Sequence, residues 1–167
     1  MILSLGEKKP RVHPSVFLAE GAMVIGNVEI GAESSVWFNT VLRADINAIR
    51  VGERTNIQDL CVFHVTNRNE VQIGSNVTIG HGAIVHGATV EDSCLIGMGA
   101  TLLDGVRVGA QSLVAAGSLV REGFVVPEGM LVAGVPATVK RALTRGERES
   151  IGRSADNYVK YVQLYRQ

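Results

Sequence analysis

The sequence predicts an all-β solenoid of six-residue repeats followed by one C-terminal α-helix. Three observations support this fold class. An aliphatic residue returns at every sixth position over most of the chain, a small or apolar side chain follows four positions later, and the end of the chain changes to a helical spacing. A period of six fits neither a continuous helix, whose apolar face repeats every three to four residues, nor a simple strand, which alternates every two.

The repeat begins at Val12 and resumes after two interruptions and one shift by a single residue. Its inward positions are Val12, Leu18, Val24, Ile30, Val36, Leu42, Val51, Ile57, Phe63, Ile73, Ile79, Val85, Val90, Ile96, Leu102, Val108, Val114, Val120, Val126 and Val132. Six residues suit a short strand and a corner, and three such edges close a triangular coil of about 18 residues. The span from Val12 to Val132 then gives roughly seven coils, stacked about 4.8 Å apart.

The C-terminal segment predicts one amphipathic helix. Thr144 and Glu147 have the spacing of a capping box. Apolar residues then follow with alternating gaps of four and three, at Ile151, Ala155, Tyr158, Val162 and Tyr165. The link around Gly134 is too short to separate domains, so we expect the helix to pack back along the solenoid. Residues 1–140 are therefore assigned to the repeat domain and residues 141–167 to the docked helix.

The composition excludes several classes of function. Lys and Arg number 16 and Asp and Glu number 16, so no basic surface is expected for nucleic acid. The chain has no signal-peptide pattern and no run of about 20 apolar residues, so we expect a cytoplasmic protein that does not bind membranes. Cys61 and Cys94 fall at inward positions, which predicts buried free thiols.

Polar residues gather where the repeat is interrupted. Leu42 and Val51 are nine residues apart and Phe63 and Ile73 are ten apart, in place of six, so loops of three and four extra residues are expected. Three of the chain's four histidines lie near these loops. The fourth, His13, has no partner in the sequence and is expected to be solvated.

The register predicts which of these residues stack. Arg43, His64 and His86 each follow an inward residue directly, and one coil plus one insertion separates each from the next, so they share an outward face. Asp59 and His81 each lie two positions after an inward residue, which places them together at a different corner. His64 and His86 can therefore share a metal ion within one chain, whereas His81 cannot join them there.

A symmetric trimer would complete the metal site. A threefold axis would bring the His81 corner of one subunit against His64 and His86 of the next. The same operation would place Asp59 beside the neighbour's Arg43, where a bidentate salt bridge would fix the interface. The sequence thus predicts a homotrimer with three shared sites, each with three imidazoles and an open fourth position, as in catalytic zinc sites.

These residues resemble the γ-class carbonic anhydrase family. The matching stretches are Arg43-Ala44-Asp45, Thr55-Asn56-Ile57-Gln58-Asp59, His64 and His81-Gly82-Ala83-Ile84-Val85-His86. The resemblance covers essentially the whole chain and implies that the solenoid is a left-handed parallel β-helix. It also implies that His64, His81 and His86 ligate zinc, or iron or cobalt as in some members.

The resemblance further implies roles around the metal. Gln58 would orient the metal-bound water, and Asn56 and Asp45 would support the pocket. Tyr158, in an Asn-Tyr pair on the helix, resembles a tyrosine that approaches the metal in some bacterial members. The implied activity is the reversible hydration of CO2 to bicarbonate by a metal-bound hydroxide at the subunit interfaces.

Two other functions are compatible with the same fold. A CoA-dependent hexapeptide acyltransferase needs a histidine as general base and a groove between subunits, but not three histidines in metal register. A non-catalytic trimeric metal-binding or partner-binding module would keep the assembly without turnover. The metal content of protein never exposed to added zinc separates the first alternative from a metalloenzyme, and a CO2 hydration assay separates the second.

Overall fold

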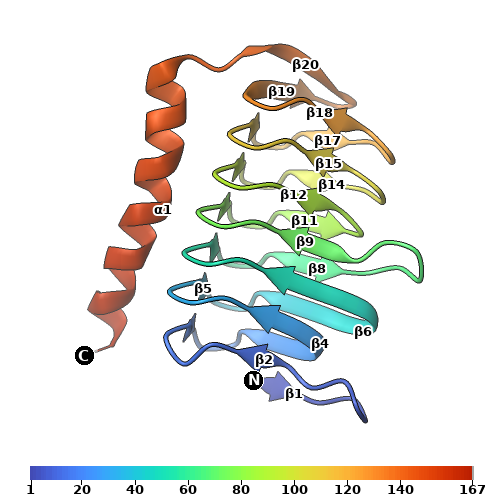
Figure 1. Ribbon diagram of the computed structural model, residues 1–167, viewed down its shortest axis with the longest axis vertical. Coiled ribbons are helices and arrows are strands. Elements are labelled where there is room, and N and C mark those ends of the chain that lie inside the picture. The colour runs from blue at the N-terminus through green and yellow to red at the C-terminus, as the bar shows by residue number, and fades with distance from the viewer. Residues whose placement is uncertain (167) are drawn as a thin grey trace.

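Short strands wind into a triangular stack of coils, and one helix runs along one side of the stack (Figure 1). The structure, a computed structural model, describes residues 1–166. Most edges of a coil are strands of two or three residues that pair in parallel with the coils above and below. The predicted parallel β-solenoid with a C-terminal helix is therefore confirmed.

Two of the three faces belong to one sheet of 12 strands. Two long strands, β4 (Met23–Ile30) and β6 (Val41–Val51), bend from one face to the other. The histidine face continues from the start of β6 through β8 (Val62–His64), β11 (Ile84–His86), β14 (Thr101–Leu102) and β17 (Leu119–Val120). The groove face continues from the end of β6 through β9 (Val71–Ile73), β12 (Thr89–Val90), β15 (Arg107–Val108) and β18 (Val125–Val126). At the N-terminal end of the stack, β4 also pairs with β1 (Ile2–Leu3) and β2 (Arg11–Val12).

The third face, which we call the helix face, is a sheet of eight strands. Its strands are β3 (Phe17–Leu18), β5 (Ser35–Val36), β7 (Asn56–Ile57), β10 (Thr78–Ile79), β13 (Leu95–Ile96), β16 (Leu113–Val114), β19 (Met130–Gly134) and β20 (Ala137–Ala142). All of these except β20 pair in parallel, one strand for each coil, which agrees with the expected number of coils.

The segment predicted to be a simple link contains a strand. β20 pairs antiparallel with β19, and the predicted domain boundary at residue 140 falls inside it. Only Ala137 of this strand is buried. The strand therefore forms through backbone hydrogen bonds, which close the free edge of the last coil, and not through a buried apolar row.

The inward positions of the repeat form one continuous core. From Val24 to Val132 every predicted inward residue is at most 5% exposed. Val12 and Leu18 in the first coil are only partly buried, because no further coil stacks below them. Each coil thus depends on its neighbours to bury its side chains, as expected for a solenoid.

Three residues outside the predicted site also behave as expected. Cys61 and Cys94 are buried free thiols, and burial raises the pKa of each to about 12. His13 is exposed, and its Nδ1 lies 2.8 Å from Ser15 Oγ.

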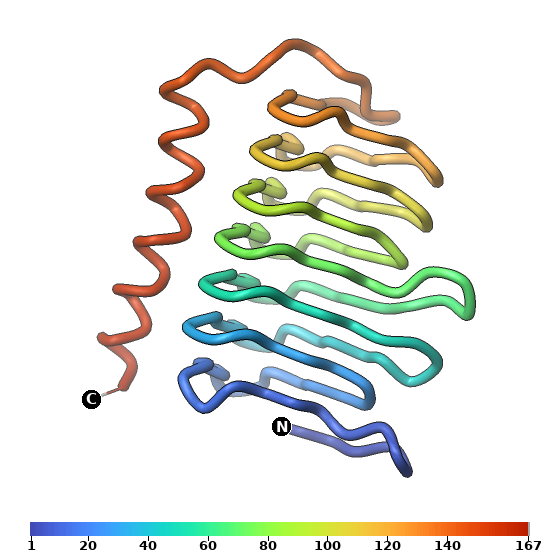
Figure 2. Tube along the Cα trace, viewed as in Figure 1, coloured from blue at the N-terminus to red at the C-terminus, as the bar shows by residue number. Residues whose placement is uncertain are grey.

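The helix α1 (Arg145–Tyr165) begins with the predicted capping box, in which Thr144 and Glu147 hydrogen-bond each other's backbone N–H. It packs on β5, β7 and β10 of the helix face through buried residues that include Ile151 and Ala155. The helix returns along the stack, so both chain termini lie at the same end (Figure 2). Among residues 1–166, no helix is both long enough and apolar enough to cross a membrane.

Two excursions widen the coils where the repeat is interrupted (Figure 2). The first lies inside β6, whose pairing with β4 shifts register between Gly26 and Val28. Gly26 has a φ of +79°, and a Cβ there would lie 2.3 Å from the Ala44 carbonyl oxygen, so this close approach requires glycine. The second joins β8 to β9 and forms the loop at residues 65–70. Both excursions border the predicted metal ligands.

Candidate metal site

The register of the histidine face is the one that the repeat predicts. In the ladder of β6, β8 and β11, Arg43 pairs with His64 and His64 pairs with His86. The three side chains therefore leave the same face in successive coils. The extra residues lie in the loops, so strands β6, β8 and β11 stay in register with one another.

The two imidazoles face each other with one nitrogen each. His64 Nδ1 lies 3.1 Å from His86 Nε2. The other nitrogen of each ring contacts a carboxylate: His64 Nε2 lies 3.1 Å from Asp45 Oδ1, and His86 Nδ1 contacts Asp104 Oδ1. A carboxylate is only an acceptor, so each outer nitrogen carries the N–H in the neutral ring. The inner nitrogens of two neutral rings then face each other as a pair that a proton or a metal ion can join.

This donor set fits a metal ion. Two nitrogen ligands at the usual Zn–N distance of about 2.0–2.1 Å in a tetrahedron lie about 3.3 Å apart, close to the 3.1 Å between His64 Nδ1 and His86 Nε2. Facing lone pairs repel unless a proton or a cation lies between them. The carboxylates behind the rings are the outer partners that fix ring orientation in metal sites.

Asp45 and Asp104 support this pair differently. Burial raises the pKa of the Asp45 carboxyl, but hydrogen bonds from His64 and Arg43 outweigh it, and the net pKa lies below its ordinary value. Asp104 was missed in the sequence, because the coil after His86 is 17 residues long and aligns Leu103 with His86, so Asp104 lies one position beyond that row. Both rings therefore rest on an acidic residue from a neighbouring coil or strand.

His81 and Asp59 lie together at the corner between the helix face and the histidine face, as the register predicts. His81 Nδ1 is 2.6 Å from Asp59 Oδ2, and Asp59 Oδ1 accepts a hydrogen bond of 3.1 Å from the Phe38 backbone N–H. Within residues 1–166 of a single chain, no three His, Cys, Asp or Glu side chains are arranged to hold a metal ion. In this chain Arg43 contacts Asp45, and its pairing with Asp59 of a neighbour stays a prediction.

Gln58 and Asn56 lie beside the His81 corner and are almost fully buried, with exposed fractions of 6% and 1%. Gln58 Nε2 donates to Asn56 Oδ1 over 3.1 Å. Gln58 Oε1 accepts from the His81 backbone N–H over 3.3 Å. The amide of Gln58 is thereby held next to the third histidine, where the resemblance requires it.

Tyr158 reaches the same corner from α1. Its ring packs edge-on against Trp37, with ring centroids 5.4 Å apart. Burial raises the pKa of Tyr158, and the nearby negative charge of Asp59 raises it further. The helix therefore brings a tyrosine towards Asp59 and His81, and not towards the His64 and His86 pair of its own chain.

Apolar side chains are exposed around both halves of the site. Val62 and Ile84 on the histidine face are 44% and 42% exposed, and Leu60 and Met98 at the His81 corner are 63% and 59% exposed. Val62, Ile84 and Leu60 lie within four positions of a predicted ligand in the sequence. Met98 lies one coil away from His81 in the same row. Several exposed apolar side chains in one region of a surface are typical of protein interfaces.

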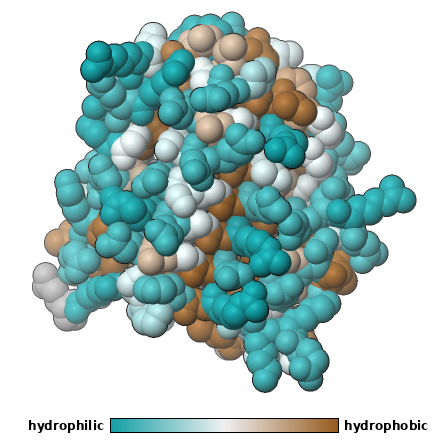
Figure 3. Space-filling model, viewed as in Figure 1, coloured by the Kyte–Doolittle hydropathy of each residue, from teal (hydrophilic) through white to brown (hydrophobic). Residues whose placement is uncertain are grey.

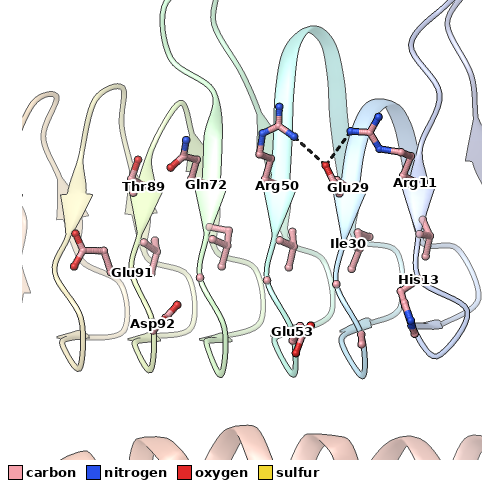
Figure 4. Close-up of a pocket in the computed structure, with 18 of the residues that line it drawn as sticks. Arg11, His13, Glu29, Ile30, Arg50, Glu53, Gln72, Thr89, Glu91 and Asp92 are labelled. Atoms are coloured by element: carbon pink, nitrogen blue, oxygen red, sulfur yellow. Dashed lines mark hydrogen bonds and ion pairs between the residues drawn. The ribbon is translucent and has the colours of Figure 1, made fainter.

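A long groove lies on a different face (Figure 3), where an apolar strip runs between polar rows. Its rim carries Glu29, which contacts Arg11 and Arg50 at 2.9 Å each (Figure 4). Glycines are among its lining residues because coils approach closely there: a Cβ on Gly52 would lie 2.6 Å from the backbone of Gly74. The stacking of the coils explains this groove, and none of the predicted site residues lines it.

Comparisons with known proteins identify the family of this chain. A model described as the hexapeptide repeat of succinyl-transferase matches residues 70–104 and 88–121. The chain is 41% identical over 166 residues to a carbonic anhydrase of Geobacillus kaustophilus, an alignment that covers 99% of this chain and 91% of the relative. It is 46% identical over 170 residues to gamma carbonic anhydrase 2 of Arabidopsis thaliana mitochondria, with 98% of this chain covered. This chain belongs to the γ-class carbonic anhydrase family.

Two further findings limit which properties of the relatives can be assigned to this chain. The chain spans 61% of the length of the Arabidopsis γ-class carbonic anhydrase that it matches. A solved Bacillus cereus structure, provisionally named an acetyltransferase, superimposes with a TM-score of 0.96 at 39% identity and covers 98% of this γ-class chain and 95% of its own. The comparisons therefore agree on the family and the fold of this chain. The names of the similar proteins, however, include both carbonic anhydrases and an acetyltransferase.

Proposed function

We propose that the protein is a metal-dependent carbonic anhydrase that interconverts CO2 and bicarbonate at sites shared between the subunits of a homotrimer. The observation that carries the proposal is the pair of facing imidazole nitrogens, His64 Nδ1 and His86 Nε2, at 3.1 Å. Solvation or core packing of two histidines does not require this arrangement with a carboxylate behind each ring. A shared metal ion would use both inner nitrogens while the carboxylates hold the outer ones.

The ligands in this proposal are His64 and His86 of one subunit and His81 of the next. A zinc ion, or iron or cobalt, would lower the pKa of water towards neutrality and polarise the substrate. Asp45 and Asp104 would hold the outer N–H of the His64 and His86 rings, so that the inner nitrogens keep their lone pairs for the metal. With three imidazole ligands, a fourth position would remain for the substrate.

Gln58 would position the attacking water. Its Oε1 already accepts from the His81 backbone N–H, so the amide lies beside the third ligand whichever subunit supplies the other two. Asn56 holds the Gln58 amide from behind through its own side-chain oxygen. A buried, hydrogen-bonded amide orients a water molecule without a charge of its own that would change the pKa of that water.

The homotrimer rests on two features of the single chain. His81 is separated from His64 and His86 by a corner of the solenoid, so a second chain has to complete the site. The exposed apolar residues Val62 and Ile84 lie between these two halves and would be covered by the neighbour. Arg43 of one subunit and Asp59 of the next would then meet and fix the register.

CoA-dependent acyl transfer is the second candidate. The provisional acetyltransferase name of the Bacillus cereus protein and the succinyl-transferase description of the repeat favour it. That chemistry needs one histidine as general base and no shared metal. It leaves the facing nitrogens of His64 and His86 without a purpose, and we therefore place it second.

Mixed trimers test the shared site. His81→Ala chains and His64→Ala chains are each expected to lack bound metal and CO2 hydration activity, because every site of either homotrimer loses one of its three ligands. When the two are unfolded together and refolded at equal amounts, about three quarters of random trimers are mixed, and each has one complete interface out of three. The expected recovery is about a quarter of wild-type metal and activity.

The exposed His13 supplies the control, because His13→Ala makes the same change away from the interface and should behave as the wild type. Mixed trimers that hold no metal would exclude sites shared between subunits. Mixed trimers that recover metal without any CO2 hydration would point to the non-catalytic module. Acyl transfer by metal-free protein would move the second candidate to first place.

A further inference from the structure

A row of hydrogen-bonded polar side chains connects α1 to the His81 corner. Ser154 of α1 accepts from Thr78 Oγ1 over 3.2 Å, and Thr78 Oγ1 accepts from Asn56 Nδ2 over 2.9 Å. Asn56 Oδ1 accepts in turn from Gln58 Nε2 over 3.1 Å. Thr78, Asn56 and Gln58 are at most 6% exposed, so the row lies beneath the helix and away from solvent.

Two backbone groups fix which side-chain atoms of this row donate and which accept hydrogen bonds. The His81 backbone N–H, which can only donate, points at Gln58 Oε1 over 3.3 Å. The Val77 carbonyl, which can only accept, lies 3.4 Å from Asn56 Nδ2. Both amides are therefore held in one orientation, because turning either over would set donor against donor or acceptor against acceptor. The Thr78 hydroxyl is left to accept from Asn56 and to donate to Ser154.

The fold does not need these polar groups. Thr78 is followed in the same ladder by Leu95 and then Leu113, which occupy the equivalent position in the next two coils. Burial of a hydroxyl or an amide is unfavourable unless every hydrogen bond is satisfied. Among the described residues, no buried polar side-chain atom lacks a partner. A satisfied polar row at a position that elsewhere accepts leucine indicates a role other than folding.

We propose that Thr78 and Ser154 are positioning residues, and that they hold Asn56 so that Gln58 keeps its carbonyl oxygen turned towards His81. The helix would then be part of the functional site, although it supplies no ligand to the metal. The effect of Thr78 and Ser154 on activity rests on the proposed CO2 hydration. Their effect on the orientation of the Asn56 and Gln58 amides does not depend on that function. The two can therefore be tested separately.

The first test follows the side-chain amide signals of Asn56 and Gln58 by ¹H–¹⁵N NMR in the metal-free trimer. Thr78→Val keeps the shape of the side chain and removes the hydroxyl, so the signals of both amides should shift and their protons should exchange faster with solvent. Thr78→Ser keeps the hydroxyl and should leave them in place. Thr89→Val makes the same change at the same repeat position on the groove face and serves as the matched control.

Ser154→Ala tests the relay from the helix without touching the sheet. It should shift the Asn56 signals in the same direction as Thr78→Val and by a smaller amount. Shifts that stop at Asn56, or that are as large in Thr78→Ser as in Thr78→Val, would overturn the proposal. Shifts that reach Gln58, together with no CO2 hydration by the metal-loaded wild type, would support the relay and reject the proposed function.

The second test uses activity in a double-mutant cycle. Loss of a group that orients a site from behind typically lowers activity or affinity about 10–100-fold, and we expect Thr78→Val to lower kcat/KM for CO2 about 10-fold with unchanged metal content. In a Gln58→Ala background the same change should have little further effect, because Thr78 acts through Gln58. An equal 10-fold loss in both backgrounds would show that Thr78 acts on stability or on another group, and the proposal would fail.

Discussion

One ladder of the helix face has two halves of opposite character. After Phe17 in the first coil it carries Ser35, Asn56 and Thr78, all at most 3% exposed. In the C-terminal coils the same position is leucine, at Leu95 and Leu113 among others. The backbone and the pairing are alike throughout. The solenoid therefore sets only the inward positions, and the outward rows are free to carry chemistry.

The other two rows of the site repeat this contrast. On the histidine face His64 and His86 are succeeded in their row by Leu103 and Arg121. At the corner, His81 is succeeded by Met98. The interruptions of the repeat occur only in the half that carries the histidines. Matched substitutions in the two halves can therefore separate what the fold needs from what the site needs.

The largest expected difference concerns the subunit interface. Arg43→Ala would leave Asp59 of the neighbouring subunit partly buried without its cation, a loss that reaches about 3–5 kcal/mol when such a pair is desolvated. Light scattering at decreasing concentration should show dissociation of this variant. Arg121→Ala removes the same side chain from the same row in the regular half and should leave the trimer intact. Equal behaviour of the two variants would mean that Arg43 does not lie at the interface.

A smaller difference concerns buried polar groups. The Trp37 indole N–H donates to Ser35 Oγ over 2.9 Å, and both residues are buried. Ser35→Ala leaves that donor without a partner and should lower the free energy of unfolding by about 1–3 kcal/mol. Removal of the donor as well, in Ser35→Ala with Trp37→Phe, should recover part of this loss. Chemical denaturation of the four combinations measures the coupling, and strict additivity would contradict the bond.

The smallest difference lies at the start of α1, over the regular half. Hydrogen bonds from Arg141 and from Thr144 lower the pKa of Glu147 to about 2. Since the folded-state pKa is below that of the unfolded chain, the stabilisation is fully present above about pH 4.3 and disappears as the pH falls towards 2. Glu147→Gln should therefore melt below the wild type at pH 7, and the two melting temperatures should converge towards pH 2. A gap that does not change with pH would mean that the charge is not involved.

The sequence predicted the features that depend on the repeat, and it missed those that depend on local contacts. The stacking of Arg43, His64 and His86 follows from counting residues, because inward side chains fix the register of the outward ones. The contact of His86 with Asp104 depends on how far two side chains reach across a corner, which the repeat does not specify. β20 was missed because a strand that pairs only through its backbone leaves no apolar row in the sequence.

The hydrogen-bonded row beneath α1 was also outside the reach of the sequence. Asn56 was predicted to support the pocket, but its partner Thr78 reads as an ordinary strand residue, and Ser154 as a polar position of an amphipathic helix. Their contact joins residues 76 positions apart and depends on how the helix is placed against the sheet. Periodicity predicts that a helix docks, and not which of its side chains meets which strand.

The path of α1 also determines when the site can be completed during synthesis. A solenoid can add coils one after another, since each contacts only its neighbours. The helix is made after all the coils, yet it covers strands β5, β7 and β10, and Arg166 just beyond its end donates to the Ser15 carbonyl in the first coil over 2.6 Å. On a ribosome the polar row at Asn56 and Thr78 stays open to water until α1 has emerged. A truncated chain can thus form stacked coils and present its histidines while the amide beside them is not yet fixed.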